Sequence, residues 1–349
     1  MLALSISNIK TKQFLNLKYR PNNLLKLALI SDELTSQSLN TMNSIKLFEQ
    51  KLQYQFWRKH KPDFILVESA WHGHKDKWRY KIANYPDYPE RNNVDLRKLL
   101  EMADKYNIPA VFWNKEDGAH FNRFIDSASL FKYILTVDAN VVERYRSILG
   151  KSVKVGVLPF AVQPNFHYPT SLPPRYYESL FVGSYSHHVH NARQQWQDMA
   201  FTAASSYGLT IIDRNSDRKS NVYRYPDLPN TIIKPAMPYD QTGQLFRQYS
   251  HCLNVNTVTD SPSMFSRRLI EIMACGRLAV TNPSLSVSTR FEDMCEVINS
   301  KEEADELFVQ LSKGYTKQQI EMMRYASNHV LENYNYDKWL QHIVEFIEL

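Results

Sequence analysis

The stretch Ser261–Pro283, SPSMFSRRLIEIMACGRLAVTNP, predicts a loop, then a helix, then a short strand. Ser261 is a residue type that caps helices, and Pro262 suits a first helical turn because its missing N–H would have no partner there. Apolar residues then recur at three- and four-residue spacing, which gives the helix one buried face: Phe265, Leu269, Ile272 and Met273. Gly276 is a typical helix stop, and the apolar run 278–281 that follows predicts a buried strand.

The charged residues of this predicted helix indicate what it could bind. Arg267 and Arg268 fall in its first turns, where free N–H groups and the helix dipole favour phosphate and arginine adds paired donors. We therefore expect a diphosphate at the helix start near Ser263 and Ser266, with Glu271 accepting hydrogen bonds from a sugar one turn later. The alternative is a surface helix whose charges are only solvated, and the pattern Arg-Arg-x-x-Glu taken alone favours that alternative.

The length and composition predict a globular protein of two domains. The 349 residues exceed one ordinary domain, and a hydrophobic content of 43%, with 13% aromatic residues, is enough for substantial cores. Only 9 glycines and 16 prolines argue against low-complexity sequence. The net charge of +6, from 42 basic and 36 acidic residues, suits an anionic substrate or a peripheral contact with anionic lipid. It does not demand nucleic acid, and we expect none as a partner.

The cysteines and the N-terminal sequence bear on the compartment. Cys252, Cys275 and Cys295 lie in apolar contexts without a C-x-x-C pair, so we expect reduced core residues. The start MLALSISNIKTKQ lacks the basic residues and the long apolar run of a signal peptide. No window approaches the ~20 apolar residues that span a bilayer. We expect a cytoplasmic protein that at most contacts the inner face of the membrane.

Segments that predict strands alternate with segments that predict helices, which is typical of an α/β protein with parallel sheets. The predicted strands are 25–31, 64–68, 110–113, 133–137, 154–158, 177–182, 209–213, 231–234, 251–256, 278–281 and 296–298. The predicted helices are 43–60, 95–106, 121–131, 141–149, 193–207, 239–249, 302–313, 317–333 and 336–349. The proline-rich stretch 159–174 predicts a linker, which gives domains at 1–165 and 176–335. The sequence contains no G-x-G-x-x-G, which argues against a dehydrogenase-type dinucleotide site.

Polar residues that follow strands are the candidate site residues, because ligands bind at the carboxyl ends of parallel strands. The residues at and after the end of strand 64–68 are candidates for the acceptor side: Glu68, Trp71, His72 and Trp78. The alternative for the two tryptophans is a place in the core. The next strand is followed by WNKEDGAHFNRF, in which Glu116, Asp117 or His120 could take a proton from a hydroxyl nucleophile. The alternative for Asp117 is an ordinary helix cap.

Two groups of histidines raise the question of a metal. His72-x-His74 and the run His187, His188 and His190 could each supply ligands. Neither group is accompanied by a cysteine or a clear third ligand. We therefore expect no metal and no bound cofactor.

Several long segments resemble the CgeB-like (spore-maturation type) family of GT-B glycosyltransferases. They are EIMACGRLAVTN, PDFILVESAWHGHKDKW, FWNKEDGAHFNRFIDSASLFKYILTVDANVVERYR and VLPFAVQPNFHYP. The resemblance implies a GT-B fold, with two Rossmann-like domains facing a central cleft. It implies an acceptor-side first domain, a second domain that holds a nucleotide-sugar donor, and a C-terminal helix, 336–349, that packs back on the first domain.

The segment GSYSHHVHNAR resembles the loop after the first strand of a GT-B donor domain. This implies that Gly183, Ser184 and Arg193 lie near the diphosphate. Ser184 stands where some related families carry arginine, so Arg193 is the candidate cation; the alternative is an exposed residue of a first helical turn. In many GT-B enzymes a second acid precedes the helix glutamate by eight positions. Here that position is Ser263, so the paired-acid signature is incomplete and the stereochemical outcome stays open.

The expected function is transfer of a sugar from a nucleotide-diphosphate donor to a hydroxyl acceptor, without a metal. The nucleotide sugar is then a substrate and not a cofactor. By analogy with the family, the acceptor belongs to a bacterial surface polysaccharide or to a spore or envelope glycan. Two alternatives are a nucleotide-sugar epimerase on the same scaffold and a non-catalytic protein that binds nucleotide or glycan.

Overall fold

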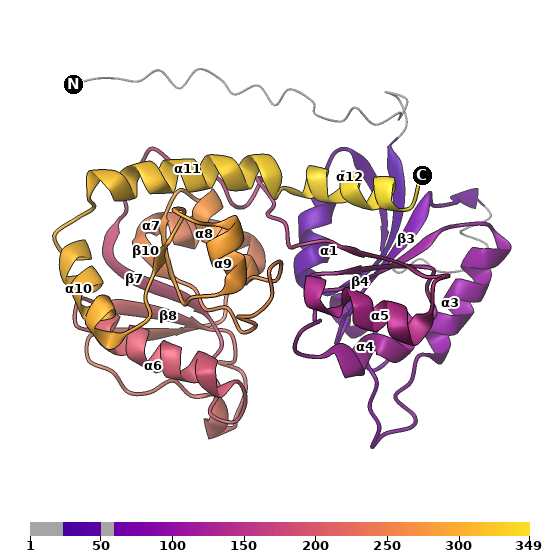
Figure 1. The fold of residues 1–349 in the computed structure, drawn as a ribbon, viewed down its shortest axis with the longest axis horizontal. Helices are drawn as coiled ribbons and strands as arrows, with labels where there is room; N and C mark the ends of the chain where they lie inside the picture. The colour runs from indigo at the N-terminus through magenta and orange to yellow at the C-terminus, as the bar shows by residue number, and fades with distance from the viewer. Residues whose placement is uncertain (1–23, 50–58) are drawn as a thin grey trace.

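Each half of the chain builds its own six-stranded parallel sheet, and the two domains lie side by side (Figure 1). The structure is a computed structural model that describes residues 24–49 and 59–349. Buried apolar clusters lie on both faces of each sheet, so each sheet is the middle layer of its domain. The predicted architecture of two Rossmann-like domains is confirmed.

The first domain contains the strands β1 to β6 and the helices that connect them. The strands are β1 (Leu25–Ile30), β2 (Ile45–Glu49), β3 (Phe64–Glu68), β4 (Ala110–Asn114), β5 (Tyr133–Thr136) and β6 (Lys154–Val157). The helices are α1 (Glu33–Asn40), α3 (Val94–Lys105), α4 (Phe121–Ala128) and α5 (Val142–Leu149), with the 3-10 turns η1 (His74–Asp76) and η2 (Ala139–Val141).

The second domain contains β7 to β12 and ends in a series of helices. The strands are β7 (Tyr176–Gly183), β8 (Leu209–Asp213), β9 (Thr231–Pro235), β10 (Tyr249–Leu253), β11 (Leu278–Thr281) and β12 (Glu296–Val297). The helices are α6 (Asn191–Ser205), α7 (Thr242–Gln248), α8 (Arg267–Ala274), α9 (Leu285–Arg290), α10 (Lys301–Leu311), α11 (Lys317–Asn333) and α12 (Tyr336–Phe346), with the 3-10 turns η3 (Asn221–Tyr223) and η4 (Tyr239–Gln241).

The strand order of each sheet fixes where a ligand can bind. The first sheet runs β2-β1-β3-β4-β5-β6 and the second β12-β11-β10-β7-β8-β9, and all the pairings are parallel. The direction of winding therefore reverses between β1 and β3, and again between β7 and β10. In open parallel sheets, a crevice for ligands forms outside the strand ends at such a reversal.

The predicted helix 43–60 is wrong where the structure describes it. Residues 45–49 form the edge strand β2, with Ile45 and Phe48 buried and Lys46 exposed. Ile45 pairs with Leu25 of β1 in the parallel register. Pairing along a sheet edge therefore overrides the helical spacing of these apolar residues. The part of the prediction that falls on 50–58 lies outside the described residues.

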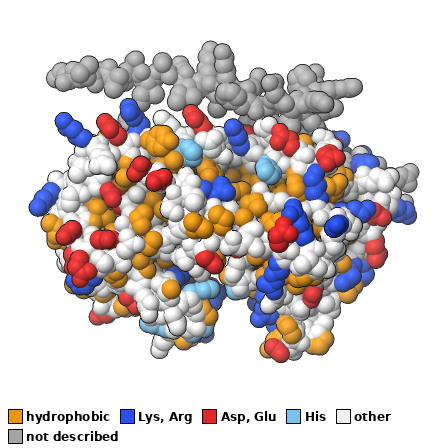
Figure 2. Space-filling model, viewed as in Figure 1, with side chains coloured by type: hydrophobic (Ala, Val, Ile, Leu, Met, Phe, Trp, Pro, Cys, Tyr) orange, Lys and Arg blue, Asp and Glu red, His pale blue; other side chains and the backbone are white. Residues whose placement is uncertain are grey.

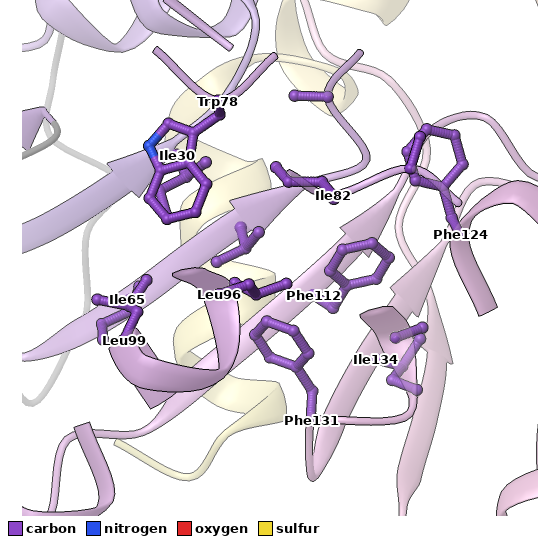
Figure 3. Packing of buried hydrophobic residues seen from close by; sticks show 14 of the residues in the cluster. Ile30, Ile65, Trp78, Ile82, Leu96, Leu99, Phe112, Phe124, Phe131 and Ile134 are labelled. Carbon is purple, nitrogen blue, oxygen red and sulfur yellow. The ribbon is translucent and has the colours of Figure 1, made fainter. Parts of the chain in front are cut away.

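One face of the first sheet packs on a core that extends beyond the helices. Figure 3 shows members of this cluster, among them Phe112 of β4, Phe124 of α4 and Leu99 of α3. Trp78 and Ile82 join the cluster from the long connection between β3 and α3. This connection is therefore held to the sheet by buried side chains.

The opposite face of the first sheet is covered by α12, although α12 follows the second domain in sequence (Figure 1). Trp339 and Ile343 are buried against Leu27 and Trp113 of the sheet. The rings of Trp113 and Trp339 lie 4.9 Å apart in an edge-to-face arrangement. The chain thus crosses between the domains twice, once before β7 and once between α11 and α12.

The two crossings touch each other. The N–H of Val162 donates to the carbonyl of Tyr334 at 2.7 Å, and Val162 forms an isolated parallel bridge with Asn335. Asn335 also caps α12, because its side chain accepts from the N–H of Lys338. The linker and the α11–α12 junction are therefore one joint between the domains.

The predicted start of the helix at Ser261 and Pro262 is wrong. Helix α8 begins at Arg267, with Ser266 as the N-cap residue. Oγ of Ser261 instead donates to Oδ1 of Asp138 in the first domain, at 2.6 Å. The segment ahead of the helix is thus used to contact the other domain, and this contact competes with helical structure.

Two further expectations concern the cysteines and the membrane. Cys252, Cys275 and Cys295 are buried and unpaired, as the sequence predicts. None of the helices in the described parts of the chain is long and apolar enough to cross a bilayer.

Candidate active site

The start of α8 lies against the end of β7 in the second domain. Nε of Arg268 donates to the carbonyl of Val182 at 2.5 Å, and its guanidinium lies 4.5 Å from the ring centroid of Phe181. A Cβ on Gly183 would meet Nη2 of Arg268 at 2.8 Å, so a glycine at the strand end is what admits this arginine. Nη1 of Arg268 has no hydrogen-bond partner among the described residues.

Arg193 reaches the same place from α6. Its Nη1 donates to Oγ1 of Thr257 at 3.1 Å, and its Nη2 donates to the carbonyl of Ser184 at 2.9 Å. Arg193 is partly buried, so the alternative of a freely exposed first-turn residue does not hold. The loops after β7 and β10 therefore share this guanidinium at the reversal point of the second sheet.

Positive charge accumulates at this reversal point, and Glu271 favours the charged form of Arg268 only in part. Burial, followed by repulsion from Arg193 and Arg214, lowers the pKa of Arg268 to about 9. Burial also lowers the pKa of Arg193, with a smaller contribution from Arg214. Arginines whose charged form is disfavoured gain most from a bound anion. A diphosphate would supply that charge and accept several hydrogen bonds.

The serines ahead of α8 have different surroundings. The N–H of Ser266 donates to Oδ1 of Asn256 at 2.8 Å, which fixes the start of the helix. Ser263 is buried at the domain boundary, where its Oγ donates to the carbonyl of Val137 and accepts from the N–H of Ala139. Ser263 is thus already occupied by contacts with the first domain.

Glu271 lies on the buried side of α8, one turn from the arginines. Its side chain is 6% exposed, and its Oε1 accepts a hydrogen bond from the hydroxyl of Tyr239 at 2.9 Å. Tyr239 opens the short turn after β9 and is itself buried. The phenol fixes the carboxylate in one orientation.

Arg267 links α8 electrostatically to the first domain. Burial opposes its charge, but nearby acidic and phenolic groups outweigh burial and raise its pKa: Tyr336, Tyr239, Glu271 and Glu68. Glu68 ends β3 of the first domain, so this interaction crosses the domain boundary. Nη1 of Arg267 also has no hydrogen-bond partner in the described parts of the chain.

The residues that face Arg267 form a buried ion-pair cluster at the reversal point of the first sheet. Nζ of Lys115 pairs with Oδ2 of Asp32 at 2.9 Å and with Oε1 of Glu68. Burial raises the pKa of Glu68, with a further contribution from Asp32, while Lys115 and Arg267 oppose the rise. The pKa of Asp32 is lowered, because Lys115 and two backbone N–H groups outweigh its burial.

The acidic loop 116–120 follows this cluster, and its carboxylates lie in different environments. Asp117 is fully buried and accepts hydrogen bonds from Asn114 at 2.7 Å and from the hydroxyl of Tyr145 at 3.0 and 3.1 Å. Burial raises the pKa of Asp117 to about 7, against the hydrogen bonds that favour the charged form. Glu116 is partly exposed. As the loop lies, Asp117 is enclosed by the first domain and does not face solvent.

His120 is the partly exposed imidazole at the end of this loop. It precedes α4, and the edge of its ring meets the ring of Trp71 with centroids 5.3 Å apart. Its charge contributes, after burial and Arg193, to a lowered pKa of His190 at the start of α6. His120 and His190 therefore lie near enough for their charges to interact, although they belong to different domains. The space-filling view shows a notch between the domains along the lower edge, with histidine side chains on the wall of the second domain (Figure 2).

Solved structures with this arrangement of two domains are known. An α-glucosyltransferase in complex with UDP-glucose and DNA containing an abasic site has a TM-score of 0.62 at 10% identity, over 94% of this chain and 100% of that one. T4 phage BGT in complex with UDP and Mn²⁺ has a TM-score of 0.54 at 12% identity, over 93% and 100%. Sucrose-phosphate synthase from Thermosynechococcus elongatus has a TM-score of 0.53 at 9% identity, over 93% and 98%.

The fold is GT-B. At these identities the likeness shows the architecture alone. Residues 187–345 also match the family described as Glycosyl transferase-like. No curated protein matches the chain. The matched residues include α6 and α8, which carry Arg193, Arg268 and Glu271.

The acceptor-side residues predicted from the sequence are not brought together in this GT-B structure. Trp71 lies beside His120, but Glu68 is enclosed in its pair with Lys115. His72 is exposed, and its Nδ1 lies 2.7 Å from Oδ1 of Asp76. Trp78 is 6% exposed and belongs to the core, which is the alternative that the sequence left open for the tryptophans.

Several residues at the GT-B domain boundary were missed by sequence reasoning. Lys115 and Tyr239 organise the carboxylates on either side, and Asn256 and Thr257 organise the arginine-bearing loops. A signal existed for Lys115, because it stands next to Glu116 in the loop after β4. Asn256 and Thr257 follow no sequence pattern that would have marked them as site residues.

No cluster of three or more histidine, cysteine, aspartate or glutamate side chains suited to a metal occurs among residues 24–49 and 59–349. His187 contacts the carbonyl of Arg224 through Nε2, and His188 contacts Ser186 through Nδ1. These histidines therefore have protein partners. The absence of a metal requirement stays a prediction.

Proposed function

We propose that this protein is a glycosyltransferase that moves a sugar from a nucleoside diphosphate to a hydroxyl acceptor. The observation that carries the proposal is the pair of guanidinium groups of Arg268 and Arg193 held between β7 and β10, with Nη1 of Arg268 buried and without a hydrogen-bond partner among the described residues. The family match over residues 187–345 supports it, because that match includes both arginines. UDP is the first nucleotide to test, because two of the similar structures contain UDP or UDP-glucose.

The arginines are proposed to stabilise the leaving group. As the glycosidic bond breaks, negative charge grows on the diphosphate oxygen, and fixed guanidinium groups lower the energy of that state. One well-placed donor of this kind contributes roughly 3–4 kcal/mol to a transition state. Nη1 of Arg267 and of Arg268, which have no partner in the described residues, point to where phosphate oxygens would be bound. Glu271, oriented by Tyr239, would accept hydrogen bonds from the ribose hydroxyls.

His120 is the proposed general base among the three candidates in the acidic loop. It is partly exposed and its ring meets the ring of Trp71 edge-on, whereas Asp117 is enclosed. The imidazole would accept the proton of the acceptor hydroxyl as the oxygen attacks the sugar carbon. Asp117 is then a positioning residue that holds the loop through Asn114 and Tyr145. Glu116 stays a second candidate at the rim.

The direct test measures nucleotide binding and donor turnover together. Calorimetric titration with UDP should give a measurable Kd, and UDP-glucose or another UDP-sugar should release UDP slowly without acceptor. Arg268→Ala should lower turnover by about 100-fold or more, the effect of losing one charge-stabilising donor. Arg324→Ala, on the exposed side of α11, is the control and should match the parent protein. Absence of binding by every nucleoside diphosphate would rule out the proposal.

Two additional arms separate the remaining possibilities. Turnover in the presence of EDTA should equal turnover with Mn²⁺ if the reaction needs no metal. Analysis of the sugar after incubation without acceptor detects an epimerase, which would return an isomerised nucleotide sugar. A surface-polysaccharide or envelope-glycan acceptor and a cytoplasmic location are further parts of the proposal. They are supported by the family resemblance and by the three free, buried cysteines, which fit a reducing compartment.

A non-catalytic nucleotide-binding protein is the second candidate. Two observations favour it: Asp117 is enclosed, and Ser263, which replaces the second acid of many GT-B enzymes, is engaged with the first domain. UDP binding without any hydrolysis or transfer, across a panel of UDP-sugars, would support this candidate over the transferase.

A further inference from the structure

A pocket of about 550 Å³ opens on the first domain, between the β3–α3 connection and the start of α3. Its rim carries Lys77 and Lys81 from the connection and Lys98 from α3. Its volume lies within the range of about 300–1,000 Å³ that is usual for small-ligand sites. Figure 2 shows lysine and arginine side chains gathered over the lower part of this domain. No part of the proposed donor site lines this pocket.

The charge in this pocket is not balanced. The one acid that lines it, Asp95, lies 2.8 Å from Nζ of Lys81. Among the described residues, no carboxylate oxygen lies within 4.0 Å of Nζ of Lys77 or Lys98. Both lysines are exposed. Three ammonium groups around one carboxylate favour a ligand with negative charge.

The base of the pocket is apolar and belongs to the core. Trp78 and Leu99 line it and are 6% and 3% exposed, and Figure 3 shows both within the buried cluster. Their burial argues against insertion into a bilayer, which requires apolar side chains that project outward. A sugar ring that carries a charged group fits better, because its charge can meet the lysines while its apolar face covers the small exposed parts of Trp78, Leu99 and Met102.

The wall of the pocket is held in place by a cluster of rings around one arginine. The guanidinium of Arg91 lies 3.9 Å from the ring centroid of Tyr88, 4.2 Å from that of Tyr80 and 5.6 Å from that of Tyr85. Tyr80 has a left-handed φ of 65°. The β3–α3 connection is therefore an ordered element that can present lysines at fixed positions.

The pocket is joined to the candidate active site through a short run of backbone. The N–H of Trp78 donates to the carbonyl of His72 at 3.0 Å. Trp71, which directly precedes His72, packs its ring against His120. The connection that carries Lys77 and Lys81 thus also carries Trp71, which contacts the proposed general base.

We propose that this pocket is an acceptor subsite that binds an anionic sugar residue, so that the acceptor is a glycan bearing carboxylate or phosphate groups. The inference rests on the proposed function, because only a transferase has an acceptor. Binding of an anionic sugar in the pocket does not itself require a donor. The lysines would pair with the anionic group, and Trp78 and Leu99 would support the sugar ring. The chain of the glycan would run past Trp71 to His120.

The test is calorimetric titration of the full-length protein with a galacturonate oligosaccharide, in the presence of UDP to occupy the donor site. The variant carries Lys77→Glu and Lys98→Glu, and the control carries Lys151→Glu, an exposed lysine after α5 in the same domain. We expect the Kd to rise about tenfold or more in the double variant and to stay within about twofold in the control, which is the scale of losing close charge pairs. A neutral malto-oligosaccharide should bind more weakly and without this difference.

Two further titrations identify the source of the anion. Inorganic phosphate should compete with the oligosaccharide in the parent protein, because either anion would occupy the lysines. Sedimentation with phosphatidylglycerol vesicles tests a lipid headgroup, and lysine-dependent sedimentation without oligosaccharide binding would overturn the glycan assignment. Equal affinity of parent and double variant for galacturonate would overturn the pocket itself. If UDP does not bind at all, the proposed function fails, while the lysine dependence of oligosaccharide binding is still measured.

Discussion

Gly118 and Val258 meet across the domain boundary, because a Cβ built on Gly118 would lie 3.0 Å from Cγ2 of Val258. The same position would lie 3.0 Å from Oδ2 of Asp138 and 3.1 Å from Sδ of Met264. Gly118 also has a φ of +84°, which side chains rarely adopt. The acidic loop and the loop before α8 thus approach each other at a position that has room only for hydrogen.

Gly118→Ala should lower donor turnover, whereas its loss of unfolding free energy should be no larger than that of a matched control. The added methyl group pushes the acidic loop away from Val258 and displaces His120. Gly150→Ala is a matched control, because Gly150 has a φ of +80° but nothing within 4 Å of its Cβ position. Urea unfolding should show a loss of about 1 kcal/mol in both variants from backbone strain. Only Gly118→Ala should lose turnover, and equal kinetics in the two variants would contradict the assigned contact.

Glu271→Ala should abolish donor turnover while the fold stays intact, since the carboxylate is proposed to hold the ribose. Tyr239→Phe removes only the hydroxyl that orients Glu271. It should weaken UDP binding by about tenfold to a hundredfold, the scale of one hydrogen bond to a charged group. Glu321→Ala, exposed on α11, serves as the control. Calorimetry with UDP and a UDP-release assay measure both effects, and full turnover by Glu271→Ala would remove that residue from the site.

The stability of the first domain should depend on pH through Asp117. Burial raises the pKa of this carboxyl from 3.8 to about 7, so the folded state holds a proton that the unfolded state has lost between these values. The free energy of unfolding contributed by Asp117 is therefore highest below pH 4, falls as the pH rises toward 7, and is constant above it. The free energy of unfolding, measured with urea, should fall less between pH 5 and pH 8 in Asp117→Asn than in the parent protein. An identical drop would place the titration on other groups.

Replacing Lys115 by methionine should be strongly destabilising. Lys115 lies between the partly buried Asp32 and the buried Glu68, so its loss leaves both carboxylates without their paired ammonium group. Removing one partner of a buried pair costs about 3–5 kcal/mol in unfolding free energy. Lys132→Met, at a side chain that is 82% exposed, should change stability by less than about 0.5 kcal/mol.

A second substitution tests whether the loss comes from charge. Glu68→Gln added to Lys115→Met removes one of the uncompensated carboxylates, so the double variant should be more stable than Lys115→Met alone. Chemical unfolding of four proteins, namely the parent, each single variant and the double variant, measures the coupling. Strictly additive losses would mean that the two side chains do not interact.

Most strands could be predicted from the sequence, because buried parallel strands are continuous apolar runs bounded by polar residues. Phe64–Glu68 and Leu209–Asp213 have the predicted bounds. β2 was missed because its two buried residues, Ile45 and Phe48, are three positions apart, which is also the spacing of a helical face. The predicted helix start at Ser261 failed for a different reason, since its hydroxyl contacts Asp138, a partner 123 residues away.

The candidate site was predictable where charge follows a strand or opens a helix. Arg268 and Glu271 lie on the predicted helix, and His120 lies in the predicted loop. Local pattern could not distinguish His120 from Asp117, because their exposure depends on Tyr145 and on the approach of the second domain. The Lys115 cluster likewise forms only when the ends of β1, β3 and β4 come together.

The bond between the N–H of Val162 and the carbonyl of Tyr334 has a mechanical consequence for how the domains move. Both covalent connections pass through this point, so sliding one domain over the other would pull them apart and break the bond. Rotation about the line through Val162 and Asn335 preserves it. The linker and the α11–α12 junction thus act as one hinge about which each domain can move as a unit with its own sheet intact.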